Sequence, residues 1–542
     1  MKVGLPFLFF LLLFLISVQL NAQNKTIDVL HYRFEISLND TGNIINGKAT
    51  IHLRMKEHCS MIYFDLKGFN DSTGYGMKVL DVSEDNKDLK FSQDSEHVNI
   101  YFNKACLSNT LKNITVTYSG VPADGLIIDT NKFAKRTFFA DNWPNRAHNW
   151  IPCNDHPSDK ASVEFIVIAP DHYRVIANGI LVKESFLPNH LKRTHWKEDL
   201  DLPTKVMVIG VADFAVQLVA TIDHIPITSW VFPENRTAGF SQYAVGKNML
   251  PFYIKYIGTY PYKKLANVQS KTIFGGMENA SNIFYYQNSV KMDSFQHEDY
   301  INLEGLFAHE EAHQWFGDEA SETNWQHVWL SEGFATYMTH LYFEHRYGED
   351  TLKSRMLADR EKVIAFYKKR KTPVVDTTSQ KAPFVLLNAN SYQKGGWVLH
   401  MLRRKLGDAI FQKGIRAYYK IYKGRNASTD DFMNVMENVS KQNLKLFFEQ
   451  WLYMPGHPVL QGKWHYDPNK KMVTVNIRQM QDVLIQFPLQ IGITGNGKLI
   501  LKTMQTDKRS TSFYIPLNTQ PQSIQLDPEV NLLFEGTLRE AQ

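Results

Sequence analysis

The sequence predicts a multidomain α+β protein in which a helical middle part lies between two β-rich parts. At 542 residues the chain is too long for one hydrophobic core. Residues 28–220 alternate at period two between turn residues, as strands do. From about 225 to 455 long helical segments follow, and alternation returns from Gly462 to Phe534. We therefore expect domains at 23–224, 225–455 and 456–542.

Residues 1–22 have the composition of an export signal. Lys2 is followed by an almost unbroken apolar run from Val3 to Leu20 and then by the small residue Ala22. This pattern predicts a cleavable secretory signal peptide, and hence a secreted or periplasmic protein with no stable membrane insertion after cleavage. The alternative is an uncleaved membrane anchor, because the run is near the ~18 residues that span a bilayer.

The overall composition is that of a soluble globular protein, with 44% hydrophobic and 21% charged residues. A net charge of +5 is small for this length, which argues against a nucleic-acid partner. An exported protein permits one disulfide, and Cys59 and Cys106 are the better pair because both lie in the first β-rich part. The alternative is that these two and Cys153 are unpaired core cysteines.

The first β-rich part contains several segments of clear alternation, which we expect to form one all-β domain. They are His31–Leu38, Lys48–Met55, Val98–Asn103, Ile114–Tyr118 and Ser162–Ile168.

The helical part is expected to begin with a helix over Phe240–Tyr256. A strand over Leu265–Thr272 then leads into Gly275-Gly276-Met277-Glu278-Asn279. The two glycines let another backbone approach closely, and Glu278 offers a negative charge to a cation. Taken alone, the pentapeptide is equally a glycine turn with a solvated acid.

A metal site is predicted at His309, His313 and Glu332. The two histidines are four residues apart, so they share one face of a helix, and Glu310 completes the H-E-x-x-H pattern of zinc hydrolases. A catalytic zinc needs three protein ligands and one open position. Glu332 opens a second amphipathic helix and supplies the third ligand. The alternative, two histidines satisfied within a core, must explain three ligand types at ligand spacing.

The remaining segments follow in order. A charged helix is expected over about 352–371, and Tyr392 comes just before a glycine-containing helix. Alone, that tyrosine could serve only in packing. A further helix is expected near Ser428, with Asp431 as its capping partner. The strands after it, such as Leu499–Thr503, predict a small β-sandwich.

Together these motifs resemble the aminopeptidase N-like family of gluzincin zinc metallopeptidases. They are H-E-x-x-H with the glutamate of W-L-S-E-G-F-A, the G-G-M-E-N segment, and Pro152-Cys153-x-Asp155-x-Pro157. The resemblance implies a saddle-shaped N-terminal β domain, a thermolysin-like catalytic domain and a small C-terminal β-sandwich. The helical C-terminal domain of many relatives is expected to be absent.

The resemblance also implies a zinc aminopeptidase that releases single residues from peptides with a free N-terminus, with one Zn²⁺ per chain. Glu310 would take the proton of the attacking water, Tyr392 would donate a hydrogen bond to the oxyanion, and Glu278 would bind the α-ammonium. Gly275, Gly276, Met277 and Asn279 would complete the substrate site.

This sequence departs from the family pattern at two positions. Relatives usually carry a glutamine where Asp141 stands and an amine-binding glutamate where Trp143 stands. Asp141 is therefore a candidate second anchor for the amine, and a polar loop residue is the alternative. Two alternative functions are an endoprotease, which leaves G-G-M-E-N unexplained, and an inactive binding module, which intact Glu310 and Tyr392 oppose.

Overall fold

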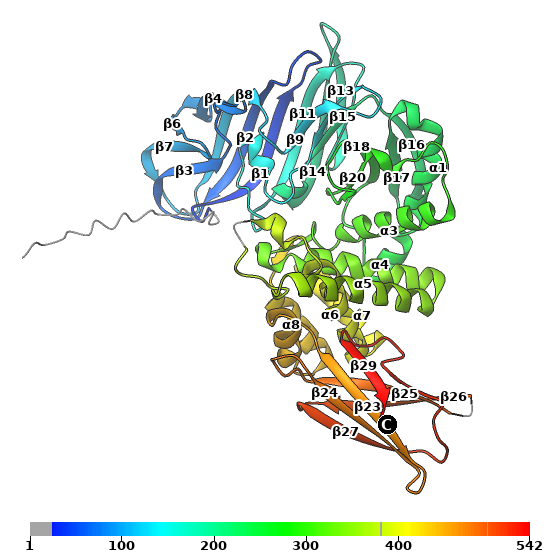
Figure 1. Cartoon of the computed structure of the whole chain (residues 1–542). Helices are drawn as coiled ribbons and strands as arrows, with labels where there is room; N and C mark the ends of the chain where they lie inside the picture. Colours follow the sequence, from blue (N-terminus) through cyan, green and yellow to red (C-terminus); the bar gives the residue numbers. More distant parts are fainter. Residues whose placement is uncertain (1–23, 380–381, 496, 542) are drawn as a thin grey trace, which may run out of the picture.

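The structure is a computed structural model that describes residues 24–379, 382–495 and 497–541. The predicted signal at 1–22 lies outside these residues. The predicted multidomain α+β class is confirmed: β-rich parts lie at the two ends of an elongated molecule, with the helices between them (Figure 1). None of the helices in the described part of the chain is long and apolar enough to cross a membrane.

The N-terminal part is built on an eight-stranded sheet whose buried face carries the predicted alternation. Tyr32, Phe34 and Ile36 of one strand all point into the core. The sheet order is β13 (Ile180–Leu187), β14 (Leu191–Pro203), β11 (Lys160–Pro170), β1 (Ile27–Ser37), β2 (Ile45–Met55), β8 (Leu111–Val121), β4 (Gly76–Glu84) and β5 (Lys87–Asp88). Within it, β1 and β11 pair in parallel.

Two smaller sheets complete this part. One has the order β3 (Cys59–Asp65), β7 (His97–Cys106) and β6 (Lys90–Gln93). The other has the order β12 (Arg174–Ala177), β15 (Ile209–Ala212), β10 (Arg136–Ala140) and β9 (Leu126–Thr130). Cys59 and Cys106 are direct partners across β3 and β7, yet both are free thiols, as is Cys153. The structure therefore has the unpaired alternative.

A five-stranded mixed sheet begins the middle part. Its order is β16 (Ala215–Ile222), β17 (Ile225–Val231), β18 (Leu265–Ser270), β20 (Asn282–Tyr286) and β19 (Gly276–Met277), so β19 is an edge strand. The predicted boundary between 224 and 225 falls in the turn between β16 and β17, and β16 pairs with the sheet of the middle part. The domain boundaries stay predictions.

The prediction of one continuous helix over Phe240–Tyr256 is wrong. The chain forms α1 (Arg236–Tyr243), a 3₁₀ turn (Ala244–Lys247) and α2 (Leu250–Tyr256). A Cβ at Gly246 would lie 2.6 Å from the Asn267 amide, so the turn is pressed against β18. Pro251 lacks an N–H and starts the new helix in its first turn, where that donor is not needed.

The other helices are α3 (His297–His313), α4 (Trp329–Tyr347), α5 (Glu349–Lys369), α6 (Gly395–Leu406), α7 (Asp408–Tyr422), α8 (Thr429–Ser440) and α9 (Lys445–Phe448), with a two-stranded sheet of β21 (Ala320–Glu322) and β22 (Arg425–Ala427). Every residue of α4 from Trp329 to Phe343 is buried, because α3, α5 and α6 pack around it. The predicted capping box at Ser428 and Asp431 is confirmed at the start of α8.

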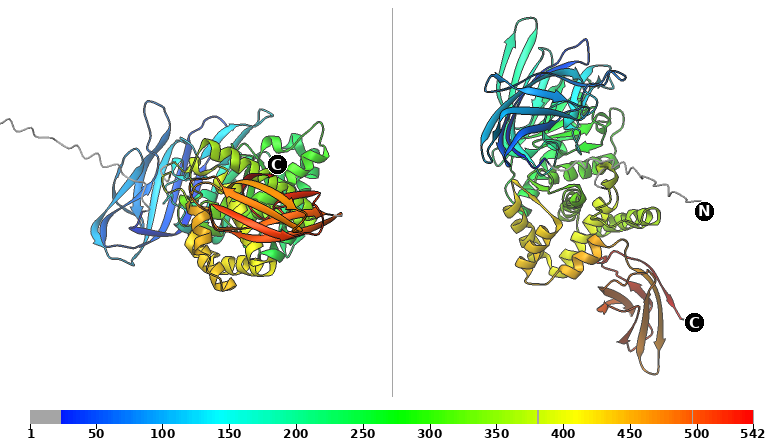
Figure 2. Two further views of the ribbon diagram at one scale, coloured as in Figure 1. Left: turned by 60° about the horizontal axis from the view of Figure 1, so that its bottom comes forward. Right: turned by 90° about the vertical axis from the view of Figure 1, so that its left-hand side faces the viewer.

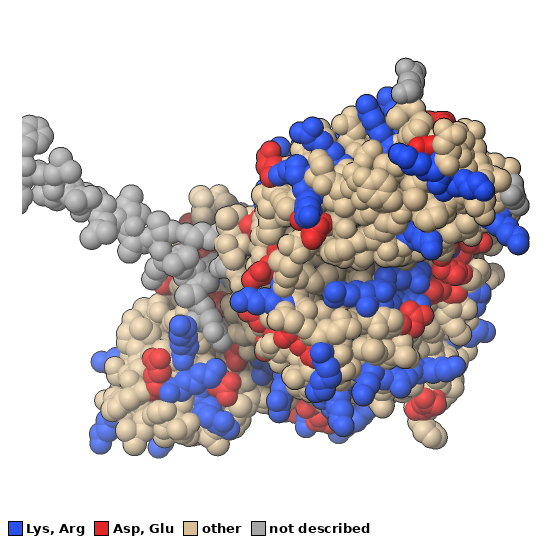
Figure 3. Space-filling model, turned by 90° about the horizontal axis from the view of Figure 1, so that it is seen from below, with Lys and Arg blue, Asp and Glu red and all other residues tan. Residues whose placement is uncertain are grey.

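The C-terminal part is the expected sandwich, and it projects from the helices (Figure 2). One sheet has the order β27 (Ser510–Pro516), β24 (Met472–Gln479), β23 (Val459–Asp467) and β29 (Glu535–Glu540); the other has β26 (Lys498–Thr506), β25 (Phe487–Gly495) and β28 (Ser523–Leu526). On the face seen in Figure 3, acidic side chains are interspersed among the basic ones.

Candidate active site

The His309 and His313 side chains come from the C-terminal end of α3, with His313 in the last turn and His309 one turn before it. At the start of this helix the Asp299 carboxylate accepts a hydrogen bond from the Gln296 N–H at 3.0 Å, which satisfies an otherwise unpaired donor. At its end the Nε2 atoms of the two histidines lie 3.2 Å apart. The helix thus presents two ring nitrogens to one point, as the spacing predicts.

Glu332 reaches the same point from the first turn of α4. Its Oε2 lies 3.4 Å from His309 Nε2 and 3.3 Å from His313 Nε2. Zinc ligands at about 2.0–2.1 Å in a tetrahedron stand about 3.3 Å from one another. The three observed separations match that geometry, so these residues fit a zinc ion.

Burial and charge at Glu332 also fit a cation. The carboxylate is buried, and Oε2 accepts no hydrogen bond from the described residues. Burial acts to raise the pKa of Glu332, but positive charge at His313 outweighs it and holds the pKa well below its usual range, so the carboxylate stays ionised beside a cation. An ionised oxygen without a donor is costly in a protein interior unless a cation approaches it.

His313 is oriented by contacts at its other nitrogen. Nδ1 lies 3.1 Å from the Phe316 carbonyl oxygen and 3.0 Å from Ser331 Oγ. A proton on Nδ1 leaves Nε2 free to bind a metal. Gly317, at φ +125°, permits this arrangement, because a Cβ there would lie 2.3 Å from Ser331 Oγ.

Glu310 faces the cavity beside strand β19. A Cβ at Gly276 would lie only 2.3 Å from Glu310 Oε1, so glycine is required for this close approach. Burial raises the pKa of Glu310 well above its usual value, His313 opposes that rise, and Glu278 and Glu332 add to it. The carboxyl group is thus placed where its proton affinity is high.

Tyr392 lies on a π-helical turn, Asn390–Lys394, rather than on a regular helix. Its ring is stacked on His309 with the ring centroids 5.9 Å apart. The turn is fixed from outside: Asn390 donates to the Thr372 carbonyl at 2.8 Å, and Lys394 donates to the Gly456 carbonyl at 2.8 Å. Burial raises the pKa of Tyr392 well above 10, so its hydroxyl is a donor.

Glu278 is the remaining acid at the site. Its side chain is buried, and Oε1 has no hydrogen-bond partner among the described residues. Its backbone carbonyl accepts a hydrogen bond from Gln314 Nε2 at 2.6 Å, which ties the G-G-M-E-N segment to the residue after α3. An unpaired buried carboxylate oxygen beside the histidines is suited to a cationic group.

One cavity of about 290 Å³ joins most of the predicted residues. It is lined by Trp143, Phe274, Gly275, Gly276, Met277, Glu278, Leu306, His309, Glu310, His313, Glu332, Leu387 and Tyr392. Asn279 is fully buried but is not part of this lining.

Asp141 is also outside the lining, since both of its carboxylate oxygens are engaged elsewhere. Oδ1 accepts from Arg146 Nη2 at 2.5 Å, and Oδ2 accepts from the Ile273 N–H at 3.2 Å. Trp143, two residues on, lines the cavity instead. A role for Asp141 as an amine anchor stays a prediction.

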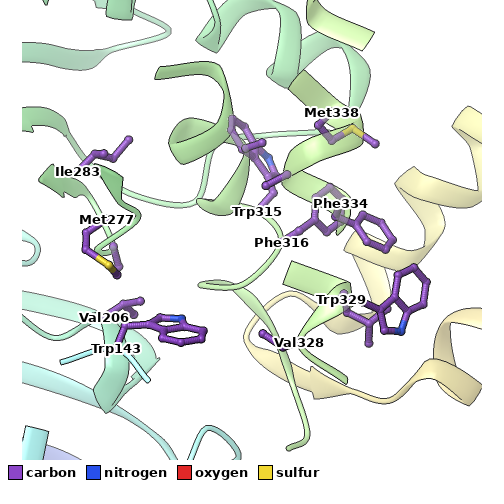
Figure 4. Packing of buried hydrophobic residues seen from close by; sticks show 14 of the residues in the cluster. Trp143, Val206, Met277, Ile283, Trp315, Phe316, Val328, Trp329, Phe334 and Met338 are labelled. Atoms are coloured by element: carbon purple, nitrogen blue, oxygen red, sulfur yellow. The ribbon is translucent and has the colours of Figure 1, made fainter. Parts of the chain in front are cut away.

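The sequence interpretation missed four cavity residues: Trp143, Phe274, Leu306 and Leu387. The sequence does contain an indication for Trp143, because this residue stands where relatives carry a glutamate. The other three are apolar residues whose place at a site follows only from the folded chain. In Figure 4 the side chain of Met277 points toward the Trp143 indole.

Two family profiles match this chain. The Peptidase M1 N-terminal domain matches residues 29–206, and the Peptidase family M1 domain matches residues 242–451. The second match contains both histidines, Glu332 and Tyr392, while the first contains Trp143.

Similar proteins cover much of the chain. Glutamyl aminopeptidase of Sus scrofa is 26% identical over 350 residues, which is 61% of this chain and 37% of that protein. Aminopeptidase M1-C of Oryza sativa subsp. japonica is 29% identical over 329 residues, 58% of this chain and 37% of that protein. The matches thus span little more than a third of these relatives.

A solved structure shares the fold. Aminopeptidase A of Legionella pneumophila, in complex with aspartic acid, superposes with a TM-score of 0.83 at 17% identity. The superposition covers 94% of this chain and 60% of that one.

Proposed function

This chain belongs to the M1 family of peptidases, and we propose that it is a zinc-dependent aminopeptidase that releases single N-terminal residues from peptides. One observation carries the proposal. Three ligand atoms at tetrahedral zinc spacing share a cavity with Glu278, whose buried oxygen has no partner among the described residues. The first feature suits hydrolysis, and the second suits a free amine.

His309, His313 and Glu332 would hold one zinc ion per chain. A zinc ion at such ligands lowers the pKa of a water toward neutrality and polarises a carbonyl group. Glu310 takes a proton from the attacking water and passes it to the leaving amine. Tyr392 donates its hydroxyl hydrogen to the carbonyl oxygen as negative charge develops there, a contact that is strongest in the transition state.

Glu278 binds the α-ammonium and thereby fixes the scissile bond one residue from the end of the substrate. The backbone of Gly275 and Gly276 supports this placement, since β19 is a sheet edge to which an extended peptide can add. Met277 and Asn279 belong to the same segment. An acetylated end lacks the charge and adds bulk, so it is excluded.

The location of the protein is a separate part of the proposal. We propose export on the sequence of residues 1–22. N-terminal sequencing of protein from the producing cell tests this, because cleavage leaves Gln23 as the first residue, whereas an anchor leaves the apolar segment attached.

The chemical proposal is tested with the metal and with Glu310→Gln. Chelation should abolish peptide hydrolysis, and added Zn²⁺ should restore it. Glu310→Gln should retain one zinc per chain by elemental analysis and lose most of kcat, because the amide cannot accept the proton. Full activity in metal-free protein, or in the Glu310→Gln variant, would refute the mechanism.

A further inference from the structure

The cavity has two chemically different ends. His309, His313, Glu332, Glu310 and Tyr392 form the polar end, where hydrolysis is proposed. The apolar end is formed by Trp143, Phe274, Met277, Leu306 and Leu387. Glu278 lines the same cavity, and ligand atoms of Glu278, Glu310 and His313 all lie within 4.8 Å of one another, so Glu278 lies close to the polar end.

The apolar end is backed by a packed group of aromatic rings. Trp143, only 2% exposed, packs edge-on against Trp325 with ring centroids 5.2 Å apart and against Phe384 at 6.3 Å. Phe384 in turn stacks on Phe274 at 6.2 Å. These contacts hold the indole in place, so this wall is formed before any substrate arrives.

No cation serves this end of the cavity. Among the described lining residues none is a lysine or an arginine, whereas Glu278, Glu310 and Glu332 are all acidic. Two nearby cations are already engaged: Lys205 pairs with Glu322 at 2.6 Å, and Arg146 pairs with Asp141 and Asp124. A carboxylate entering the apolar end would therefore lie near Glu278 and find no lysine or arginine partner among the described lining residues.

The geometry of a substrate places its first side chain at this end. The α-ammonium and the first side chain of a substrate are attached to the same Cα. When the ammonium contacts Glu278, the first side chain therefore lies next to Glu278 as well. The carbonyl carbon occupies the metal side. Met277, adjacent to Glu278 in the chain and directed toward Trp143, bounds the space that is left (Figure 4).

We infer that the apolar end is the subsite for the first residue, that it selects large apolar and aromatic N-terminal residues over acidic ones, and that Trp143 and Phe274 determine this selection. The inference rests on the proposed aminopeptidase function. It separates this chain from relatives named glutamyl aminopeptidase and from the solved neighbour that holds aspartic acid. The reason for this difference is that the described lining residues include three acids and no lysine or arginine.

The test is kcat/KM of the zinc-loaded enzyme on peptides that differ only in the first residue. The value of kcat/KM should be higher for peptides that begin with Leu or Phe than for those that begin with Ala. One buried methylene group that Ala lacks is worth about 10–200-fold. Met and Glu side chains have similar lengths, so the ratio of kcat/KM for Met-ended to Glu-ended peptides reports the effect of the charge. We expect this Met-to-Glu ratio to be at least about 10². Matched acetylated peptides should not be cleaved.

Variants locate the selection. Trp143→Leu removes the aromatic wall and should reduce the Phe-to-Ala ratio at least several-fold. Trp464→Leu, a nearly buried tryptophan of β23 in the sandwich, is the matched control and should keep the wild-type order of substrates. Phe274→Arg places a cation in the lining at a half-buried position and should lower the Met-to-Glu ratio about tenfold or more.

The outcomes separate the two proposals. If free peptides are trimmed but Glu or Asp is removed as fast as Met or Leu, the subsite inference is overturned while the aminopeptidase stands. If no free peptide is trimmed, the proposed function fails, and the inference fails with it. If Trp143→Leu does not fold, Phe274→Arg decides: an unchanged Met-to-Glu ratio places the subsite elsewhere.

Discussion

The contact between Gly276 and Glu310 gives the sharpest single-residue prediction. A Cβ at position 276 would lie 2.3 Å from Glu310 Oε1, 2.5 Å from Cδ and 2.6 Å from Cγ. Carbon contacts settle at about 3.5–4.0 Å, so Gly276→Ala must displace the Glu310 side chain, or the strand, by about 1 Å or more. A misplacement of about 1 Å at a reacting group costs about 10²-fold in rate.

We therefore expect Gly276→Ala to reduce kcat about 10²-fold with its zinc content unchanged. The added methyl group meets Glu310 first, and none of its three nearest atoms belongs to a zinc ligand. Gly275→Ala is the neighbouring comparison, because a Cβ there meets nothing within 4 Å. It should lose less than about tenfold. Steady-state kinetics with metal analysis measures both, and wild-type kcat in Gly276→Ala would refute the assignment of Glu310 as the proton acceptor.

Three further predictions concern separate parts of the site. Tyr392→Phe removes only the donor hydroxyl, so kcat should fall by about 10²–10³ with little change in KM; an unchanged kcat would make the residue a packing element. Glu278→Gln should lower kcat/KM by about 10²–10⁴ for free peptides and reduce the discrimination against acetylated ones. Equal discrimination in variant and wild type would contradict an amine contact. Burial lowers the pKa of Lys394 to about 7, below its unfolded value of about 10.4. Below pH 7 the buried amine is charged and the whole cost of burying that charge opposes folding; toward pH 10 this cost disappears. The free energy of unfolding should therefore rise between pH 7 and pH 10, by up to about 1.4 kcal/mol per pH unit. Denaturant titrations at several pH values should show that this rise is smaller in Lys394→Met, and identical slopes would refute it.

The clustering of the three predicted zinc ligands could be foreseen because its signals are local. His309 and His313 are brought together by the period of one helix, and Glu332 by the start of the next. The alternation of Tyr32, Phe34 and Ile36 likewise reports a strand directly. Such patterns depend on backbone geometry that every chain shares.

Features set by distant contacts could not be predicted. The carboxylate of Asp141 is bound by the backbone of Ile273, 132 residues away, and nothing in the local sequence indicates that pairing. The helix expected over Phe240–Tyr256 breaks where Gly246 meets Asn267. The π-helical turn that carries Tyr392 is fixed by carbonyls of Thr372 and Gly456, which lie in other segments.

The central claim, one-residue trimming from a free amine, is tested most directly by mass spectrometry of products. The zinc-loaded chain is incubated with one apolar-ended peptide in free and acetylated forms. The account predicts a ladder of products, each shorter by one N-terminal residue, from the free peptide and an intact acetylated peptide. Internal fragments, or equal cleavage of the acetylated peptide, would contradict it and indicate an endopeptidase.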